Sequence, residues 1–134
     1  MLRHAATAML VAMAGACTPA QRPALEIHFP QAAKASAESD AALLTGVLHV
    51  EASCLTVGEE NWLIVWPATA RLESGEPIRV SNAADGATVA VGETIAVAGG
   101  EAAGGKLMAS DLKAPLPTDC GNKVWVAGPF KRAQ

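Results

Sequence analysis

A run of five apolar residues, Trp62 to Trp66 (WLIVW), sets the strongest limit on the architecture of this chain. The run follows a polar turn, Glu59-Glu60-Asn61, and ends at Pro67, which cannot continue a hydrogen-bonded strand. A strand without any polar position is typical of one covered on both faces. At an open sheet edge it would promote aggregation, so the run favours a closed or nearly closed barrel.

Short stretches in which apolar and polar residues alternate predict the other strands. Residues 25–29 alternate and stop at Pro30, and residues 44–57 form the longest stretch. The apolar phase of that stretch changes after Ser53, which predicts a bulge or kink there. Asp85-Gly86 and Gly92-Glu93 are turn signals. Further strand signals lie at residues 78–81, 89–91, 95–97 and 123–127, the last closed by Gly128-Pro129.

Strand signals about 8 to 15 residues apart, punctuated by glycine and proline, indicate an all-β fold. We expect a small closed or nearly closed barrel of six to seven short strands, with an OB-like barrel or a sandwich as alternatives. Residues 31–40 are polar and rich in alanine, and they predict a solvated loop. Residues 99–105 (GGEAAGG) predict a flexible glycine loop, while residues 107–112 fit either a short strand or one helical turn.

The first sixteen residues have the three parts of a secretory signal peptide. Arg3 and His4 give a basic start, residues 5–13 are apolar except for Thr7, and Ala14-Gly15-Ala16 precedes Cys17. Small residues followed at once by cysteine resemble the lipobox of bacterial lipoproteins. The resemblance implies cleavage before Cys17 and acylation of its thiol, although the family prefers leucine where this chain has Ala14. Cleavage by the ordinary signal peptidase, which leaves Cys17 as a free thiol, is the alternative.

This interpretation divides the chain into a signal peptide (1–16), an acylated cysteine with a proline-containing stem (17–23), and a single β-domain (24–134). The acyl chains at Cys17 would attach the protein to a membrane of the cell envelope. In a host with two membranes, Thr18 after the cysteine implies, by the family's sorting rule, the periplasmic face of the outer membrane.

Three cysteines are an odd number for an exported protein, and acylation of Cys17 would account for one of them. The remaining pair, Cys54 and Cys120, would meet an oxidising compartment and form a disulfide. The bridge would close a loop of 66 residues and stabilise the fold by about 4 kcal/mol on the chain-entropy account.

Charge argues against nucleic acid as a partner. Arg3 is the only Lys or Arg of the leader, so the mature chain has nine basic residues against thirteen acidic ones. Its longest basic run, Lys131-Arg132, is too short to form a basic surface along a nucleic-acid phosphate backbone.

Few residues are candidates for catalysis or for binding a metal, and the sequence predicts no catalytic residue, no metal site and no cofactor. The glycine loop lacks the Ser or Thr of a phosphate-binding loop, since Leu107 follows Lys106. His28, His49 and Cys54 are possible metal ligands, but two strand histidines are more often simply exposed. A disulfide at Cys54 excludes a nucleophile pair with His49. A paired-acid site would need acidic residues from turn-like segments, where solvated carboxylates are expected: Glu59, Glu60, Glu73, Glu76, Asp85 and Glu93.

Trp62 and Trp66 are the strongest hint of a binding surface, because residues four apart on a strand share a face. They would either form a stacking platform for a sugar or a base, or fill a core in a chain with only 4% aromatic residues. We favour the core, and ligand binding at Trp62 and Trp66 is the alternative.

The runs CLTV (54–57), WLIVWP (62–67) and VGETIAVAGGE (91–101) are similar to small bacterial secreted and lipoprotein domains over residues 44–127. The resemblance implies no activity. The sequence therefore predicts a non-enzymatic envelope lipoprotein, a structural or interaction module whose partner is an envelope protein or glycan. A binder of small ligands or glycans is the second hypothesis, and a hydrolase is the third.

Overall fold

The structure, a computed structural model, describes residues 15, 26–35, 42–102 and 107–133. The predicted acylation site Cys17, the stem and all of the signal peptide except Gly15 lie outside the described residues. Within the described ranges, no helix has the length and apolar character needed to cross a membrane.

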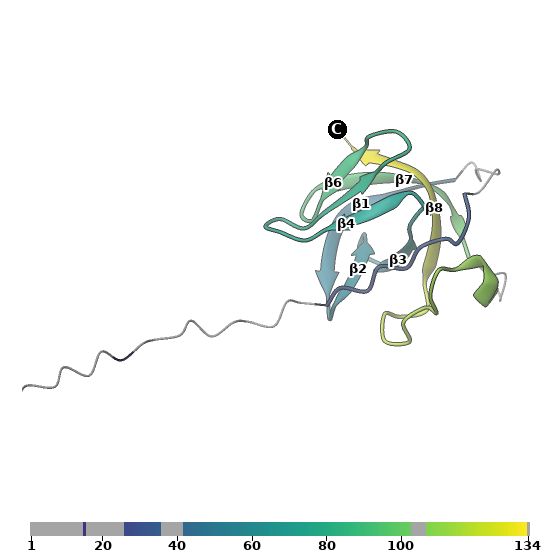
Figure 1. The fold of residues 1–134 in the computed structure, drawn as a ribbon. Coiled ribbons are helices and arrows are strands. Elements are labelled where there is room, and N and C mark those ends of the chain that lie inside the picture. Colours follow the sequence, from purple (N-terminus) through teal and green to yellow (C-terminus); the bar gives the residue numbers. More distant parts are fainter. Residues whose placement is uncertain (1–14, 16–25, 36–41, 103–106, 134) are drawn as a thin grey trace, which may run out of the picture.

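Over the residues described, the fold is all-β, as the sequence predicts, and eight strands form a five-stranded ring and a separate three-stranded sheet (Figure 1). The ring closes in the order β1-β2-β3-β8-β7, and β3 and β8 run parallel while the other neighbours are antiparallel. A five-stranded ring of this kind is OB-like. Its strands are β1 (Ala42–Glu51), β2 (Cys54–Val57), β3 (Trp62–Val65), β7 (Thr94–Glu101) and β8 (Val124–Arg132).

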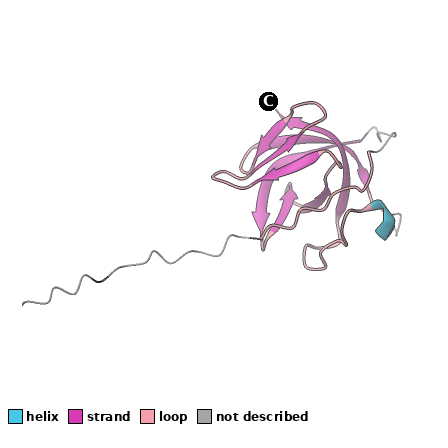
Figure 2. Cartoon of the chain, in the orientation of Figure 1, coloured by secondary structure: helices cyan, strands magenta, loops and turns pink. Residues whose placement is uncertain are grey.

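The second sheet has the order β4-β5-β6 and lies against one end of the ring (Figures 1 and 2). Its strands are β4 (Ala70–Glu73), β5 (Arg79–Asn82) and β6 (Thr88–Ala90). The predicted turns at Asp85-Gly86 and Gly92-Glu93 are confirmed, and Asp85 accepts a hydrogen bond from the Ala87 N–H at 2.9 Å. Val80 and Val89 are fully buried and belong to the core of the ring, so the two sheets share one hydrophobic core.

The core explains why β3 has no polar position. Ile64 and Trp66 face the interior, where Trp66 packs against Phe29 and Phe130 with ring centroids 5.7 and 5.1 Å apart. Leu63 is only 1% exposed on the opposite face, where it packs with Cys54 and Cys120. The prediction that this strand is covered on both faces is therefore confirmed.

The stretch 44–57 is not one kinked strand but a hairpin, so that detail of the prediction was wrong. Glu51 pairs with Cys54, and the two turn residues between them, Ala52 and Ser53, have φ angles of 48° and 67°. Two consecutive residues with positive φ are what a tight hairpin turn requires. The change of apolar phase after Ser53 marks a full reversal of the chain.

One further segment differs from the prediction, and a second, left open between a short strand and a helical turn, is helical. Residues 26–35 form no continuous strand: His28 makes an isolated parallel bridge with Cys54, and Gln31 makes one with Trp66. The segment 107–112 contains a short 3-10 helix, η1 (Ala109–Asp111), and no strand.

The glycines at 99 and 100 belong to β7 and pair with β8, while residues 103–106 of the predicted glycine loop lie outside the described residues. Strand β8 also continues past Gly128-Pro129, where the sequence predicts its end. The register shifts between Val97 and Gly99, and a bulge of this kind accommodates Pro129 within the sheet.

Candidate functional site

The disulfide between Cys54 and Cys120 is present, as predicted, with the two Cα atoms 5.6 Å apart. Cys54 opens β2, and Cys120 lies in the long connection between β7 and β8. The bridge therefore fixes that connection against the β1–β2 hairpin.

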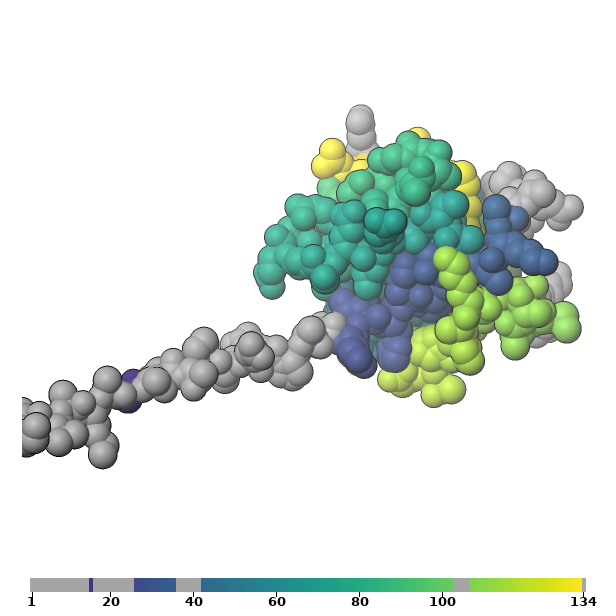
Figure 3. Space-filling view, in the orientation of Figure 1, coloured from purple at the N-terminus to yellow at the C-terminus, as the bar shows by residue number. Residues whose placement is uncertain are grey.

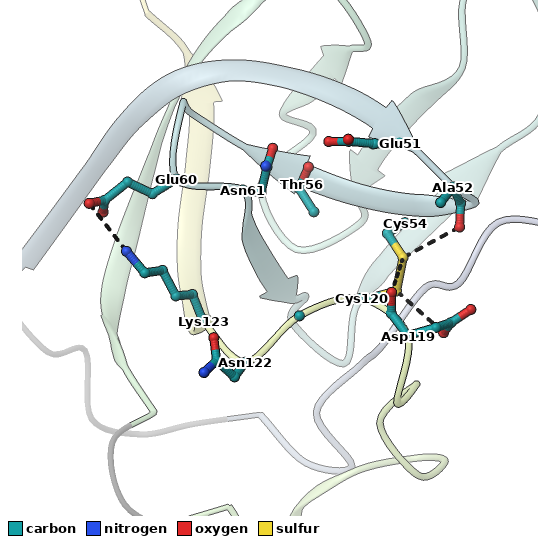
Figure 4. A pocket seen from close by; sticks show the side chains of 11 residues that line it. Glu51, Ala52, Cys54, Thr56, Glu60, Asn61, Asp119, Cys120, Asn122 and Lys123 are labelled. Carbon is teal, nitrogen blue, oxygen red and sulfur yellow. Dashed lines mark hydrogen bonds and ion pairs between the residues drawn. A yellow bond between two sulfur atoms is a disulfide. The ribbon is translucent and has the colours of Figure 1, made fainter.

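A cleft of about 360 Å³ lies beside the disulfide. Three segments wall it: the β1–β2 hairpin with Glu51, the β2–β3 turn with Glu60 and Asn61, and the 119–123 loop with Asp119 and Lys123. Figure 4 shows Glu60 and Lys123 at one end of the cleft and the disulfide with Asp119 at the other. Seven of the eleven lining residues have polar or charged side chains, so the cleft can bind a ligand that forms hydrogen bonds.

The charges in the cleft are mostly acidic. Lys123 Nζ lies 3.2 Å from Glu60 Oε1 and 5.5 Å from the centroid of the Trp62 ring. Trp62 Nε1 donates to Glu60 Oε2 at 3.2 Å, so Lys123, Glu60 and Trp62 form one contact group at the rim. Asp119 lies 3.6 Å from His28 Nε2. Glu51 adds a third carboxylate to the lining, and an acidic cleft repels phosphate groups.

No family model, curated protein or solved structure matches the chain.

The two histidines considered as metal ligands lie in different surroundings. His49 Nε2 is 3.0 Å from Thr56 Oγ1 and 2.6 Å from Asn61 Oδ1, while its Nδ1 is 3.2 Å from the Val47 carbonyl oxygen. A hydroxyl beside an imidazole resembles a nucleophile with its base. Thr56 is only 2% exposed, however, so its hydroxyl offers little surface to a substrate. The contact instead gives a buried hydroxyl its hydrogen-bond partner.

His28 is held at the other side of the cleft. Its backbone N–H donates to the Ser53 carbonyl oxygen at 2.9 Å, which places its ring beside Asp119 and Cys120. Figure 3 shows the segment 26–35 on the surface between the β4–β6 sheet and the segment 107–123. No local sequence pattern marks Asp119, because its partners come from chain segments that only the fold brings together.

The tryptophans do not form a two-ring platform. They share a face, as the alternation predicts, but that face is the interior of the ring. Trp66 is fully buried, while Trp62 is partly buried and packs edge-on against Trp125 with centroids 5.9 Å apart. Of the two, only Trp62 is partly exposed; its ring lies beside Lys123, which lines the cleft, but Trp62 itself is not a lining residue.

The acidic residues weighed as a paired-acid site are distributed over separate turns: Glu59 and Glu60 between β2 and β3, Glu73 and Glu76 at the β4–β5 connection, Asp85 between β5 and β6, and Glu93 between β6 and β7. A hydrogen bond from Arg132 lowers the pKa of the Glu93 carboxyl, which also accepts the Ala90 N–H, while partial desolvation acts in the opposite direction. This perturbation comes from a surface ion pair and does not indicate an acid–base site.

Proposed function

We propose that this protein is a lipid-anchored, non-enzymatic interaction module of the cell envelope that binds its partner in the cleft beside the disulfide. The junction Ala14-Gly15-Ala16-Cys17 supports the anchor. The pairing of Cys54 with Cys120 supports export, because such bridges persist in oxidising compartments.

The observation that carries the binding proposal is that the cleft is covalently braced. The disulfide joins the 119–123 loop to the start of β2, and both of its cysteines line the cleft. Walls fixed before binding lose less conformational entropy when a partner arrives. A braced polar cleft is therefore better suited to specific recognition than a mobile loop would be.

A glycan is the second candidate among partners, and the acidic charge of the cleft favours it over nucleic acid. OB-like barrels bind oligosaccharides or oligonucleotides at the face of their second and third strands, flanked by the loop between the first two strands and the loop between the last two. In this chain the β1–β2 hairpin and the β7–β8 connection flank the cleft. The carboxylates of Glu51, Glu60 and Asp119 disfavour phosphates but can accept hydrogen bonds from sugar hydroxyls, and the ring of Trp62 lies next to Lys123, which lines the cleft. This is an analogy of fold.

The experiment is affinity purification of the tagged full chain from membranes of its own host, with a photo-crosslinking residue at Asn122 in the cleft. Glu51→Lys reverses a charge in the cleft, and Glu101→Lys makes the same change at the end of β7 as the matched control. We expect the wild type and Glu101→Lys to capture the same partner and Glu51→Lys to lose it. Equal capture by both variants would show that the cleft is not the binding site.

The glycan candidate is tested with soluble peptidoglycan fragments as the probe. We expect them to change the tryptophan fluorescence of the wild type and to bind Trp62→Ala more weakly. A partner that proves to be a protein, together with no response to the fragments, would exclude the glycan.

A further inference from the structure

Three atoms that can ligate a metal converge at the disulfide end of the cleft. One ring nitrogen of His28, a carboxylate oxygen of Asp119 and the Sγ atom of Cys120 lie within 4.8 Å of one another. His28 comes from the segment 26–35 and the other two from the 119–123 loop, so the fold, and not the local sequence, creates the group.

The geometry of the pair His28 and Asp119 matches that of ligands around one ion. Their Nε2 and Oδ1 atoms are 3.6 Å apart. In a tetrahedral zinc site, with zinc–nitrogen and zinc–oxygen distances of about 2.0 to 2.2 Å, neighbouring nitrogen and oxygen ligands lie about 3.3 to 3.6 Å apart. The backbone hydrogen bond from His28 to Ser53 holds the histidine near this position without a metal.

Cys54 adds a fourth side chain, because its sulfur is bonded to that of Cys120. While the bond exists, neither sulfur is a thiolate, and only His28 and Asp119 are strong ligands. Two cysteines, a histidine and an aspartate would complete a tetrahedral set once the bond is broken. Leu63, Leu116 and Val124 pack around the two cysteines, and an apolar shell of this kind strengthens electrostatic interactions in a metal site.

We infer that Cys54, Cys120, His28 and Asp119 form a redox-controlled zinc site. The disulfide prevents zinc from binding, and its reduction allows zinc to bind. This inference goes beyond the proposed function and does not depend on the identity of the partner. In the oxidised state the bridge braces the cleft. In the reduced state the same cysteines hold Zn²⁺ and the metal replaces the covalent brace.

A dithiol reductant converts the site from the oxidised to the reduced state. The reductant transfers two electrons and two protons to the Cys54–Cys120 bond, which breaks to give two thiols, while the reductant becomes a disulfide. Zn²⁺ then displaces both thiol protons to solvent and forms two zinc–sulfur bonds. His28 contributes a nitrogen lone pair and Asp119 a carboxylate oxygen. Both cysteines line the cleft but are only 3% and 6% exposed, so the cleft is the route by which the reductant and the ion would reach them.

The test uses the full chain with Cys17→Ser, so that the third thiol does not contribute. One sample is reduced with a phosphine, which is then removed without oxygen, and the other stays oxidised. Each is titrated with Co²⁺ alone, a spectroscopic probe of zinc sites, and then with Zn²⁺. We expect one equivalent of Co²⁺ to give the visible bands of tetrahedral cobalt and a thiolate charge-transfer band in the reduced sample only. Zn²⁺ should abolish both and protect Cys54 and Cys120 from alkylation.

Variants separate a built site from two free thiols. His28→Ala and Asp119→Asn should each weaken metal binding by about tenfold or more. His49→Gln, which changes the histidine outside the group, should bind as the parent does. Circular dichroism of the reduced protein monitors the fold, and a sample that loses structure on reduction should regain its β spectrum with Zn²⁺. Absence of metal binding, or binding unchanged in His28→Ala and Asp119→Asn, would overturn the inference.

Discussion

Arg132, the last residue of β8, donates a hydrogen bond from Nη1 to Glu93 Oε2 at 2.9 Å. The contact ties the end of the ring to the turn between β6 and β7, because Glu93 also accepts the Ala90 N–H at 2.7 Å through Oε1. One carboxylate therefore connects the ring with the three-stranded sheet.

This contact predicts a pH dependence of stability. The pKa of Glu93 is lowered from its ordinary value of 4.5, chiefly by the hydrogen bond from Arg132. A lowered folded-state pKa stabilises the protein above the ordinary value, and this contribution is lost as the pH falls through the folded-state value. Glu93→Gln should therefore flatten the loss of stability on acidification, measured by urea unfolding at a series of pH values. Glu101→Gln, at the end of β7, is the control and should keep the slope of the parent.

Gly99 should not tolerate a side chain. A Cβ atom there would collide with the backbone carbonyl of Val126, and the φ angle of 142° lies in a region that other residues rarely adopt. Gly99→Ala should lower the free energy of unfolding by about 1–3 kcal/mol or more. Gly128→Ala, whose new Cβ would have its nearest contact at 3.7 Å, should change it much less. Similar urea midpoints for the two variants would show that the bulge between β7 and β8 relaxes freely.

Much of the fold can be predicted from the sequence. The alternation of apolar and polar residues and the WLIVW run both reflect which positions of a strand are buried. The β1–β2 turn could not be predicted, because turns with positive φ usually contain glycine or asparagine. Here Ala52 and Ser53 adopt positive φ instead. Strand β4 (ARLE) has too few apolar positions to show a period. From the sequence, the glycines of β7 indicate a loop. The structure places them in a strand, where Gly99 lies against the backbone of β8, and a sequence does not show such a contact.

Of the candidate site, only the disulfide could be predicted from the sequence, because that prediction needs no more than the number of cysteines and an assignment for Cys17. With Cys17 assigned to the predicted lipid anchor, the odd number of cysteines leaves Cys54 and Cys120 as the pair without any geometry. By contrast, Asp119 and His28 meet because the 119–123 loop and the segment 26–35 both lie beside the β1–β2 turn, which no local pattern shows. For Trp62 and Trp66 alternation predicts a shared face, but in a run apolar on both faces it does not tell which face is inside.

The two tryptophans should differ in their contribution to stability. Trp66 is fully buried between Phe29 and Phe130, so Trp66→Ala should cost about 3–5 kcal/mol in the free energy of unfolding. Trp62 is partly exposed, and Trp62→Ala should cost roughly 1–2 kcal/mol. Chemical denaturation followed by circular dichroism measures both. A larger loss for Trp62→Ala would contradict the assignment of Trp66 to the core.

The lipid anchor is tested at Cys17. In the native host, the mature protein should fractionate with membranes and carry the mass of its acyl chains, whereas Cys17→Ser should be released in soluble form and lack that mass. Cys54→Ala with Cys120→Ala serves as the control for loss of cysteine as such, and this variant should keep the mass of the acyl chains. A wild-type protein that is soluble and unmodified would show that the ordinary signal peptidase processes the chain.

The last prediction concerns the contribution of the disulfide. The bridge spans a sequence separation of 66 residues, and its loss should lower the free energy of unfolding by about 2–5 kcal/mol. The outer face of β3 is the part most directly affected, because Leu63 packs against both cysteines. In Cys54→Ala with Cys120→Ala the 119–123 loop is no longer held to β2, so Leu63 should gain exposure and the variant should aggregate more readily. Hydrogen exchange of residues 62–66 and light scattering measure these two effects. Non-reducing peptide mapping should recover one cross-linked fragment from the wild type. Unchanged exchange in β3 after loss of the bridge would mean that the barrel alone, without its covalent brace, protects this strand.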